Sequence, residues 1–72
     1  MTLADLRSII SSNGSIIINA SKYVTSDLKT IASTASSGNA KIYIKNASRL
    51  TISDLKSIAS AGKGSVVFDF TE

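Results

Sequence analysis

The stretch of sequence that decides the fold is NASKYVTSDLKTIAS, residues 19–33, because it returns almost unchanged as NASRLTISDLKSIAS, residues 46–60. Ten of the 15 aligned positions are identical, and no gap is needed, so that Asn19 aligns with Asn46. A shorter copy, DLRSIIS at residues 5–11, matches DLKTIAS at residues 27–33. Periods of about 20–50 residues are typical of stacked supersecondary units. The chain is therefore predicted to contain three copies of one structural unit.

Each copy begins with a segment whose apolar residues recur at helical spacing. These positions are Leu3, Leu6, Ile9 and Ile10, then Leu28, Ile31, Ala32 and Ala35, then Leu55, Ile58 and Ala59. A glycine follows each segment, at Gly14, Gly38 and Gly62. Glycine commonly ends a helix because it accepts the left-handed conformation. Three short helices that stop at these glycines are expected.

A segment rich in Ile, Val, Tyr or Phe follows each glycine, and these residue types favour strands. The three predicted strands are Ser15–Asn19, Lys41–Lys45 and Ser65–Phe70. A strand that returns through a helix to the next strand makes the two strands parallel, with a right-handed crossover. Strand order 1-2-3 is favoured because like units stack in register, although order 2-1-3 also satisfies the handedness rule.

The predicted fold class is therefore α/β, in the order α-β-α-β-α-β. Residues 1–72 form a single domain of three α-β units, at about residues 2–19, 25–45 and 51–70. The strands are expected to form a three-stranded parallel sheet with all three helices on one face.

Five residues are expected to cap the amino ends of the helices. They are Thr2, Asp5, Asp27, Thr51 and Asp54. A Thr followed three residues later by Asp is a variant of the capping box, and the carboxylate also suits the positive end of the helix dipole. In the middle copy Val24 takes the cap position, so that helix is expected to begin on Thr25.

The segment Ile42-Tyr43-Ile44-Lys45-Asn46, followed by Leu50 and a helix over Ser53–Ser60, with a repeat period of 27 residues, resembles a fragment of about two units of the α/β form of the leucine-rich-repeat family. In that family the Asn after each strand bonds the backbone of the neighbouring loop, as a ladder. The resemblance implies this loop-bonding role for Asn19 and Asn46.

Alternation along the strands assigns the two faces of the sheet. Ile42 and Ile44 are expected to face the helices, which leaves Tyr43 on the other face. Aligning Asn19 with Asn46 turns Ile17 inward and Ile16 and Ile18 outward, whereas a shift of strand 1 by one residue would exchange them. The predicted open face consists of Ile16, Ile18, Lys41, Tyr43, Lys45, Val67 and Asp69.

This open face is expected to be covered by something, because all-parallel sheets are almost always covered on both faces. A second copy of the chain is the first candidate, since twofold dimers are the commonest assemblies. The predicted function is that of a protein-interaction or assembly module whose partner is a second copy, in a homodimer, or another protein.

The residue types present exclude most enzymatic chemistry. The chain has no His and no Cys, so the familiar nucleophile–base pairs are missing. The segment AGKGS at residues 61–65 departs from the phosphate-loop pattern and follows a helix instead of a strand. No catalytic residue, cofactor or metal site is predicted, and a non-enzymatic role is expected.

The charge pattern gives the alternative function, that of a small basic nucleic-acid-binding protein. The formal net charge is +3 at pH 7, and Arg7, Lys29 and Lys56 recur after Asp-Leu, so they should form a stripe on the helical layer. No apolar run is long enough for a membrane span, and the amino terminus lacks the features of a signal peptide. No membrane partner is expected, and a cytoplasmic location is predicted.

Overall fold

The computed structural model describes residues 2–71 and confirms the predicted order of elements. The helices and strands are α1 (Leu3–Ser11), β1 (Ile16–Asn19), α2 (Thr25–Ser37), β2 (Ile42–Lys45), α3 (Ile52–Gly62) and β3 (Val66–Phe68). Two short 3-10 helices, η1 (Ala20–Lys22) and η2 (Ala47–Arg49), follow the first two strands. The chain is thus a mixed α/β fold.

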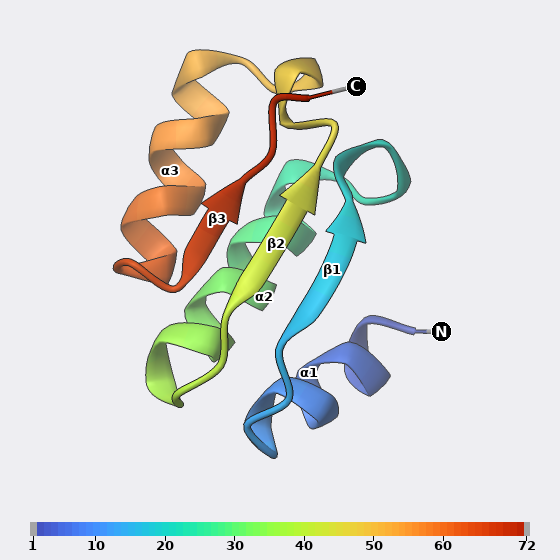
Figure 1. The fold of residues 1–72 in the computed structure, drawn as a ribbon, viewed down its shortest axis with the longest axis vertical. Coiled ribbons are helices and arrows are strands. Elements are labelled where there is room, and N and C mark those ends of the chain that lie inside the picture. Colours follow the sequence, from blue (N-terminus) through green and yellow to red (C-terminus); the bar gives the residue numbers. More distant parts are fainter. Residues whose placement is uncertain (1, 72) are drawn as a thin grey trace.

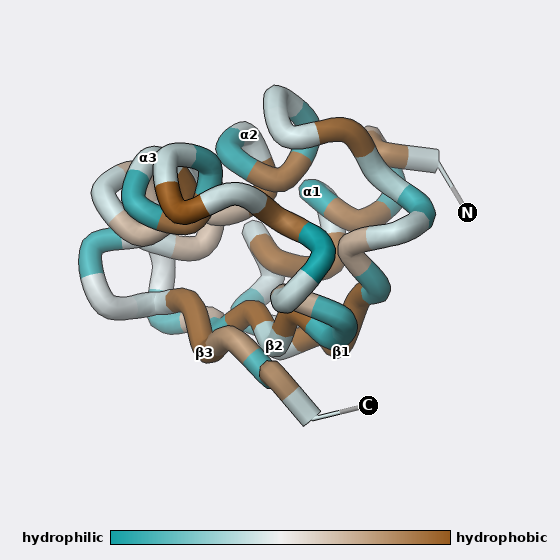
Figure 2. The backbone as a smooth tube through the Cα atoms, turned by 90° about the horizontal axis from the view of Figure 1, so that it is seen from above, coloured by the Kyte–Doolittle hydropathy of each residue, from teal (hydrophilic) through white to brown (hydrophobic). Residues whose placement is uncertain are grey.

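The three strands form one parallel sheet in the order β1-β2-β3, so the alternative order 2-1-3 is not adopted. All three helices lie on the same side of this sheet (Figure 2). The helices run roughly opposite to the strands, and the amino ends of α2 and α3 lie near the carboxyl ends of the strands (Figure 1). This arrangement is what right-handed α-β crossovers produce when like units follow one another.

The hydrophobic core fills the space between the sheet and the helical layer. Ile42 and Ile44 of the central strand are fully buried, as are Leu28 and Ile31 of the central helix α2. Helix α2 packs against both α1 and α3. It presents small side chains there, and Ala32 is fully buried. Ile10 of α1 and Ile58 of α3 are also fully buried, so all three helices contribute to the core.

The predicted register of the first strand is wrong by one residue. Ile16 pairs with Ile42 and Ile18 with Ile44, so Ile16 and Ile18 face the helices and Ile17 faces outward. Ile18 is buried, whereas the side chain of Ile17 is 68% exposed. A slip of one residue exchanges the two faces of a strand, which is why the whole assignment inverts.

The cause of the slip is an extra residue at the end of β2. In the sequence repeat Asn19 is equivalent to Asn46, but in the sheet Asn19 lies opposite Lys45. Asn46 follows one position later, in the left-handed conformation with φ 58°. The repeat therefore aligns equivalent turns, and not the residues that lie opposite each other in the sheet.

The helix caps differ between the three units. Thr2 and Asp5 form a full capping box: the Asp5 N–H donates to Thr2 Oγ1 (3.1 Å), and the Thr2 N–H donates to Asp5 Oδ2 (3.2 Å). Thr51 accepts from the Asp54 N–H at 3.1 Å. Helix α2 begins on Thr25, as expected, with Val24 as its cap residue.

The expected capping bonds at Asp27 are not formed: Val24 offers no side-chain oxygen to the Asp27 N–H, and the start of α2 has no side-chain cap bond. The Asp27 N–H bonds to the main-chain oxygen of Val24 instead, at 3.0 Å. Asp27 still lies in the first turn of α2, where a carboxylate is favourable toward the helix dipole.

Helices α2 and α3 end at the expected glycines, since Gly38 is the C-cap of α2 and Gly62 is the last residue of α3, but neither glycine adopts the expected left-handed conformation. The left-handed residues near the helix ends are Asn13, Lys63 and Gly64, while Gly38 has φ −120°. Gly62 is buried. A Cβ atom at Gly62 would overlap Cγ2 of Val66 and lie 3.4 Å from Cβ of Ala32. The glycine is needed there because α3, α2 and β3 meet at that point.

Candidate functional site

One face of the sheet carries no helix (Figure 2), and exposed apolar side chains form a row across it. Ile17, Tyr43 and Val67 occupy opposite positions on the three strands. Their side chains are 68%, 42% and 37% exposed, respectively. We call these three residues the apolar row. Parallel sheets are seldom left bare on one face, so the apolar row is the feature of this fold that most needs a partner.

Polar residues border the apolar row on both sides along the strands. Lys41 precedes β2 and Lys45 ends it, and both side chains are exposed. The Lys41 ammonium donates to the main-chain oxygen of Gly64 at 3.4 Å, and the Lys41 N–H donates to Ser15 Oγ at 3.0 Å. The face therefore has an apolar centre with a positively charged residue at each end of the central strand.

Asp69 is the acidic residue of the predicted open face, and its carboxylate accepts the hydrogen bonds that close a tight turn. Thr71 donates to Asp69 Oδ1 from its main-chain N–H at 2.8 Å and also from its hydroxyl. Asn19 makes the same two bonds with Ser21, at 2.9 Å from the N–H and 2.7 Å from the hydroxyl. Asp69-Phe70-Thr71 is therefore a further copy of the turn after β1. The sequence signal for this turn is the pattern Asx-x-Ser/Thr. The signal is hard to recognise at residues 69–71, because Asp and Phe stand there in place of the Asn and Ala of the first copy.

The two asparagines bond to each other, which differs from the role that the repeat family implies. Asn46 Nδ2 donates to Asn19 Oδ1 at 3.0 Å. Asn19 otherwise serves its own turn, through Ser21, and not the backbone of the neighbouring loop. The left-handed backbone of Asn46 turns its amide toward Asn19 in this contact. The bond joins the ends of β1 and β2 at the carboxyl edge of the sheet.

From the hydrogen bonds in the turn at Asp69, we expect the stability of the fold to depend on pH. The hydroxyl and N–H of Thr71, with a smaller contribution from the charge of Lys45, hold the pKa of Asp69 below its ordinary value of 3.8. A carboxyl whose pKa is lower in the folded state stabilises the fold above the unfolded pKa, and this contribution is lost as the pH falls through the folded pKa. The variant Asp69→Asn keeps the acceptor oxygen, as Asn19 shows, but cannot titrate.

We therefore expect Asp69→Asn to lose less stability than the wild type when the pH is lowered from neutral to below 3.8. Urea unfolding of both proteins at pH 7 and in acid measures this difference. The pKa of Asp5 is also lowered, by the main-chain and side-chain hydrogen bonds with Thr2. Because both proteins contain Asp5, its contribution to the pH dependence cancels in the comparison. Equal losses in the two proteins would contradict the prediction.

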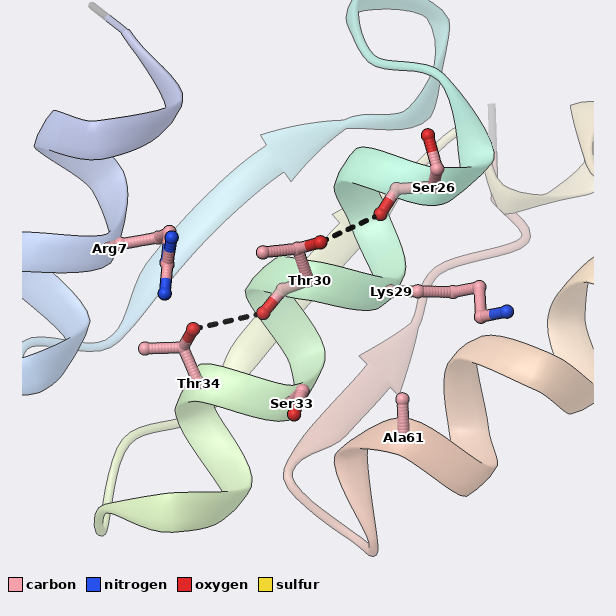
Figure 3. Close-up of a pocket in the computed structure, with 7 residues that line it drawn as sticks. All are labelled: Arg7, Ser26, Lys29, Thr30, Ser33, Thr34 and Ala61. Carbon is pink, nitrogen blue, oxygen red and sulfur yellow. Dashed lines mark hydrogen bonds between the residues drawn. The ribbon is translucent and has the colours of Figure 1, made fainter.

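A shallow hollow of about 450 Å³ lies on the opposite, helical side of the molecule (Figure 3). Arg7 and Lys29 of the predicted basic stripe line it, but Arg7 lies on the α1 side of α2, whereas Lys29 extends toward α3. The hydroxyls of Thr30 and Thr34 donate to main-chain oxygens of α2, at 3.0 and 2.9 Å. Neither the two cations nor these hydroxyls converge on a point where a phosphate group would sit.

Within residues 2–71, no group of three or more His, Cys, Asp or Glu residues is placed to hold a metal ion. None of the helices described is long and apolar enough to cross a membrane. Comparisons of the chain with protein-family models, with curated proteins and with solved structures give no match.

Proposed function

We propose that this chain is a non-enzymatic assembly module that associates through the open face of its sheet, with a second copy as its first partner. The exposed apolar row, Ile17, Tyr43 and Val67, is the observation that carries the proposal. Tyr is among the residue types enriched at protein interfaces, and in this row it occupies the central strand. The absence of Cys is compatible with a reducing compartment, so we propose the cytoplasm as the location.

The charges around the apolar row predict how salt affects this association. When two copies stack face to face, Lys41 and Lys45 of each meet the same residues of the other, and a single Asp69 per copy offsets them. Screening by salt weakens repulsion between like charges. Self-association is therefore expected to strengthen with salt concentration, whereas binding to a nucleic acid would weaken. The direction of the salt effect separates the two functions.

The test is the mass in solution, measured by light scattering over a series of protein concentrations. We expect the wild-type mass to rise with concentration, and Tyr43→Asp to weaken face-dependent association by roughly tenfold or more, because it places a charge in the centre of the apolar row. Val67→Lys is a second variant of the same face.

The matched control is Ile52→Asp, since Ile52 is 73% exposed at the start of α3, in the helical layer. It introduces the same charge on a side chain outside the apolar row, so it should associate like the wild type. Circular dichroism checks that each variant is folded. Association of Tyr43→Asp equal to that of the wild type would contradict the proposal.

A further inference from the structure

The outer edge of β1 lacks the charged residues and prolines that often discourage another strand from pairing with an edge. Strand β1 has the sequence IIIN, with no charge and no proline, and Ser15 before it adds neither. Natural edge strands are usually blunted by lysine, proline, a bulge or a covering segment. Within residues 2–71, no strand pairs with this edge.

The backbone of Ile17 carries the pairing groups of this edge. The Ile16 N–H donates to the oxygen of Lys41, so the backbone groups of Ile16 point toward β2. In a strand, successive residues direct their N–H and C=O groups to opposite sides. The N–H and C=O of Ile17 therefore point away from β2, and those of Ser15 and Asn19 share this direction.

The other edge of the sheet is better protected. Strand β3 has three residues, and the chain turns immediately after it at Asp69, where the carboxylate binds Thr71. Short edge strands and charged residues limit pairing with a further strand. The two edges are therefore unequal, and an additional strand is expected at β1.

We propose that a second copy of this chain pairs with the β1 edge, antiparallel and around a twofold axis that passes between Ile17 and the partner's Ile17. Each Ile17 N–H then donates to the other Ile17 carbonyl, and Ser15 lies opposite the partner's Asn19. The strand is self-complementary in this register because its outward groups are symmetric about Ile17. The two sheets join into one continuous sheet with all helices on the same side.

This pairing deepens the proposed function, on which it rests for the choice of a second copy, because it extends the apolar row. A face of three short strands covers roughly 200 Å² in projection, from a strand spacing of about 4.8 Å and a rise of about 3.3 Å per residue. A stable interface buries about 800 Å² on each partner. Edge pairing places the two apolar rows end to end, with the two Ile17 side chains adjacent, and so doubles the area that a further pair of copies can cover.

The experiment is carried out in the Tyr43→Asp background, so that stacking of the open faces is blocked and pairing of the edges can be measured alone. Chemical synthesis places an N-methyl group on Ile17, which removes the outward N–H and leaves the side chain unchanged. The matched control carries the N-methyl group on Phe68, whose N–H points to the outer edge of β3, because the Asp69 N–H donates to Ile44 on the β2 side.

We expect the Tyr43→Asp protein and its N-methyl-Phe68 form to dimerise, and N-methyl-Ile17 to raise the dissociation constant by roughly tenfold or more. Amide exchange of Ile17 should also slow as the protein concentration rises. If Tyr43→Asp is monomeric up to about 1 mM while the wild type associates, the result contradicts pairing at the β1 edge and supports association through the open face. If Tyr43→Asp associates like the wild type and N-methyl-Ile17 abolishes association, the result supports pairing at the β1 edge and contradicts association through the open face. A wild-type protein that stays monomeric contradicts both proposals.

Discussion

Replacing Ile44 with alanine is expected to lower the free energy of unfolding by about 2–5 kcal/mol, the usual cost of removing a large buried aliphatic side chain. Ile44 is fully buried in the central strand, between Ile18 and Phe68 in the register of the sheet. A domain of 72 residues has a total stability of roughly 4–11 kcal/mol. The variant should therefore lose a large part of its stability, as measured by urea unfolding followed by circular dichroism.

The control is Ile17→Ala, which makes the same chemical change on the neighbouring strand. Ile17 is 68% exposed, so its truncation leaves no cavity, and a change within about 0.5 kcal/mol is expected. The pair also tests the register of β1, since Ile17 would belong to the core if the strand were shifted by one residue. Comparable losses for the two variants would show that Ile17 faces the helices after all.

The second large effect is expected for Gly62→Ala, and its sign is opposite to that of a usual substitution in a helix. Alanine is favoured over glycine inside helices by about 1 kcal/mol. At Gly62, however, the added methyl group would overlap the side chain of Val66 and approach Ala32. Overpacking of this kind typically costs about 1–3 kcal/mol, so a net loss of stability is expected in thermal or urea unfolding.

Two further variants isolate the steric cause. In Gly62→Ala combined with Val66→Ala, the space vacated by the valine accommodates the new methyl group, so the double variant should lose less than the sum of the two single losses. Gly38→Ala is the control, because the atom nearest to a Cβ at Gly38 lies 3.6 Å away and φ is not positive. A stabilising effect of Gly62→Ala would contradict the close approach of α3 and β3.

The order of elements, the parallel sheet and the strand order are predictable from the sequence, because each unit repeats the same local signals. Helical spacing, Thr caps and β-branched runs act over a few residues, and the repeat carries them from one unit to the next. Most of the open face is predictable for the same reason, since Tyr43 lies between Ile42 and Ile44 in an alternating strand.

The sequence-based predictions are wrong at positions whose structure depends on contacts between units and not on local sequence within one unit. The face that Ile17 adopts is set by pairing with β2, and strand 1 is apolar at three successive positions, so alternation gives no local signal. The role of Gly62 depends on the distance to Val66, which belongs to another element. The turn at Asp69 is hidden in the sequence because Phe70 extends the apolar run of β3 beyond the end of the strand.

The common direction of the three helices has an electrostatic consequence. Each helix carries a partial positive charge at its amino end and a partial negative charge at its carboxyl end, so parallel helices reinforce one another and the whole domain becomes an electric dipole. A stack that repeats the domain in one orientation would add these dipoles side by side. A twofold axis perpendicular to the sheet reverses every helix of the second copy, so the two dipoles oppose each other and cancel. A pair closed by this perpendicular axis is in this respect favoured over an open-ended array of domains in one orientation.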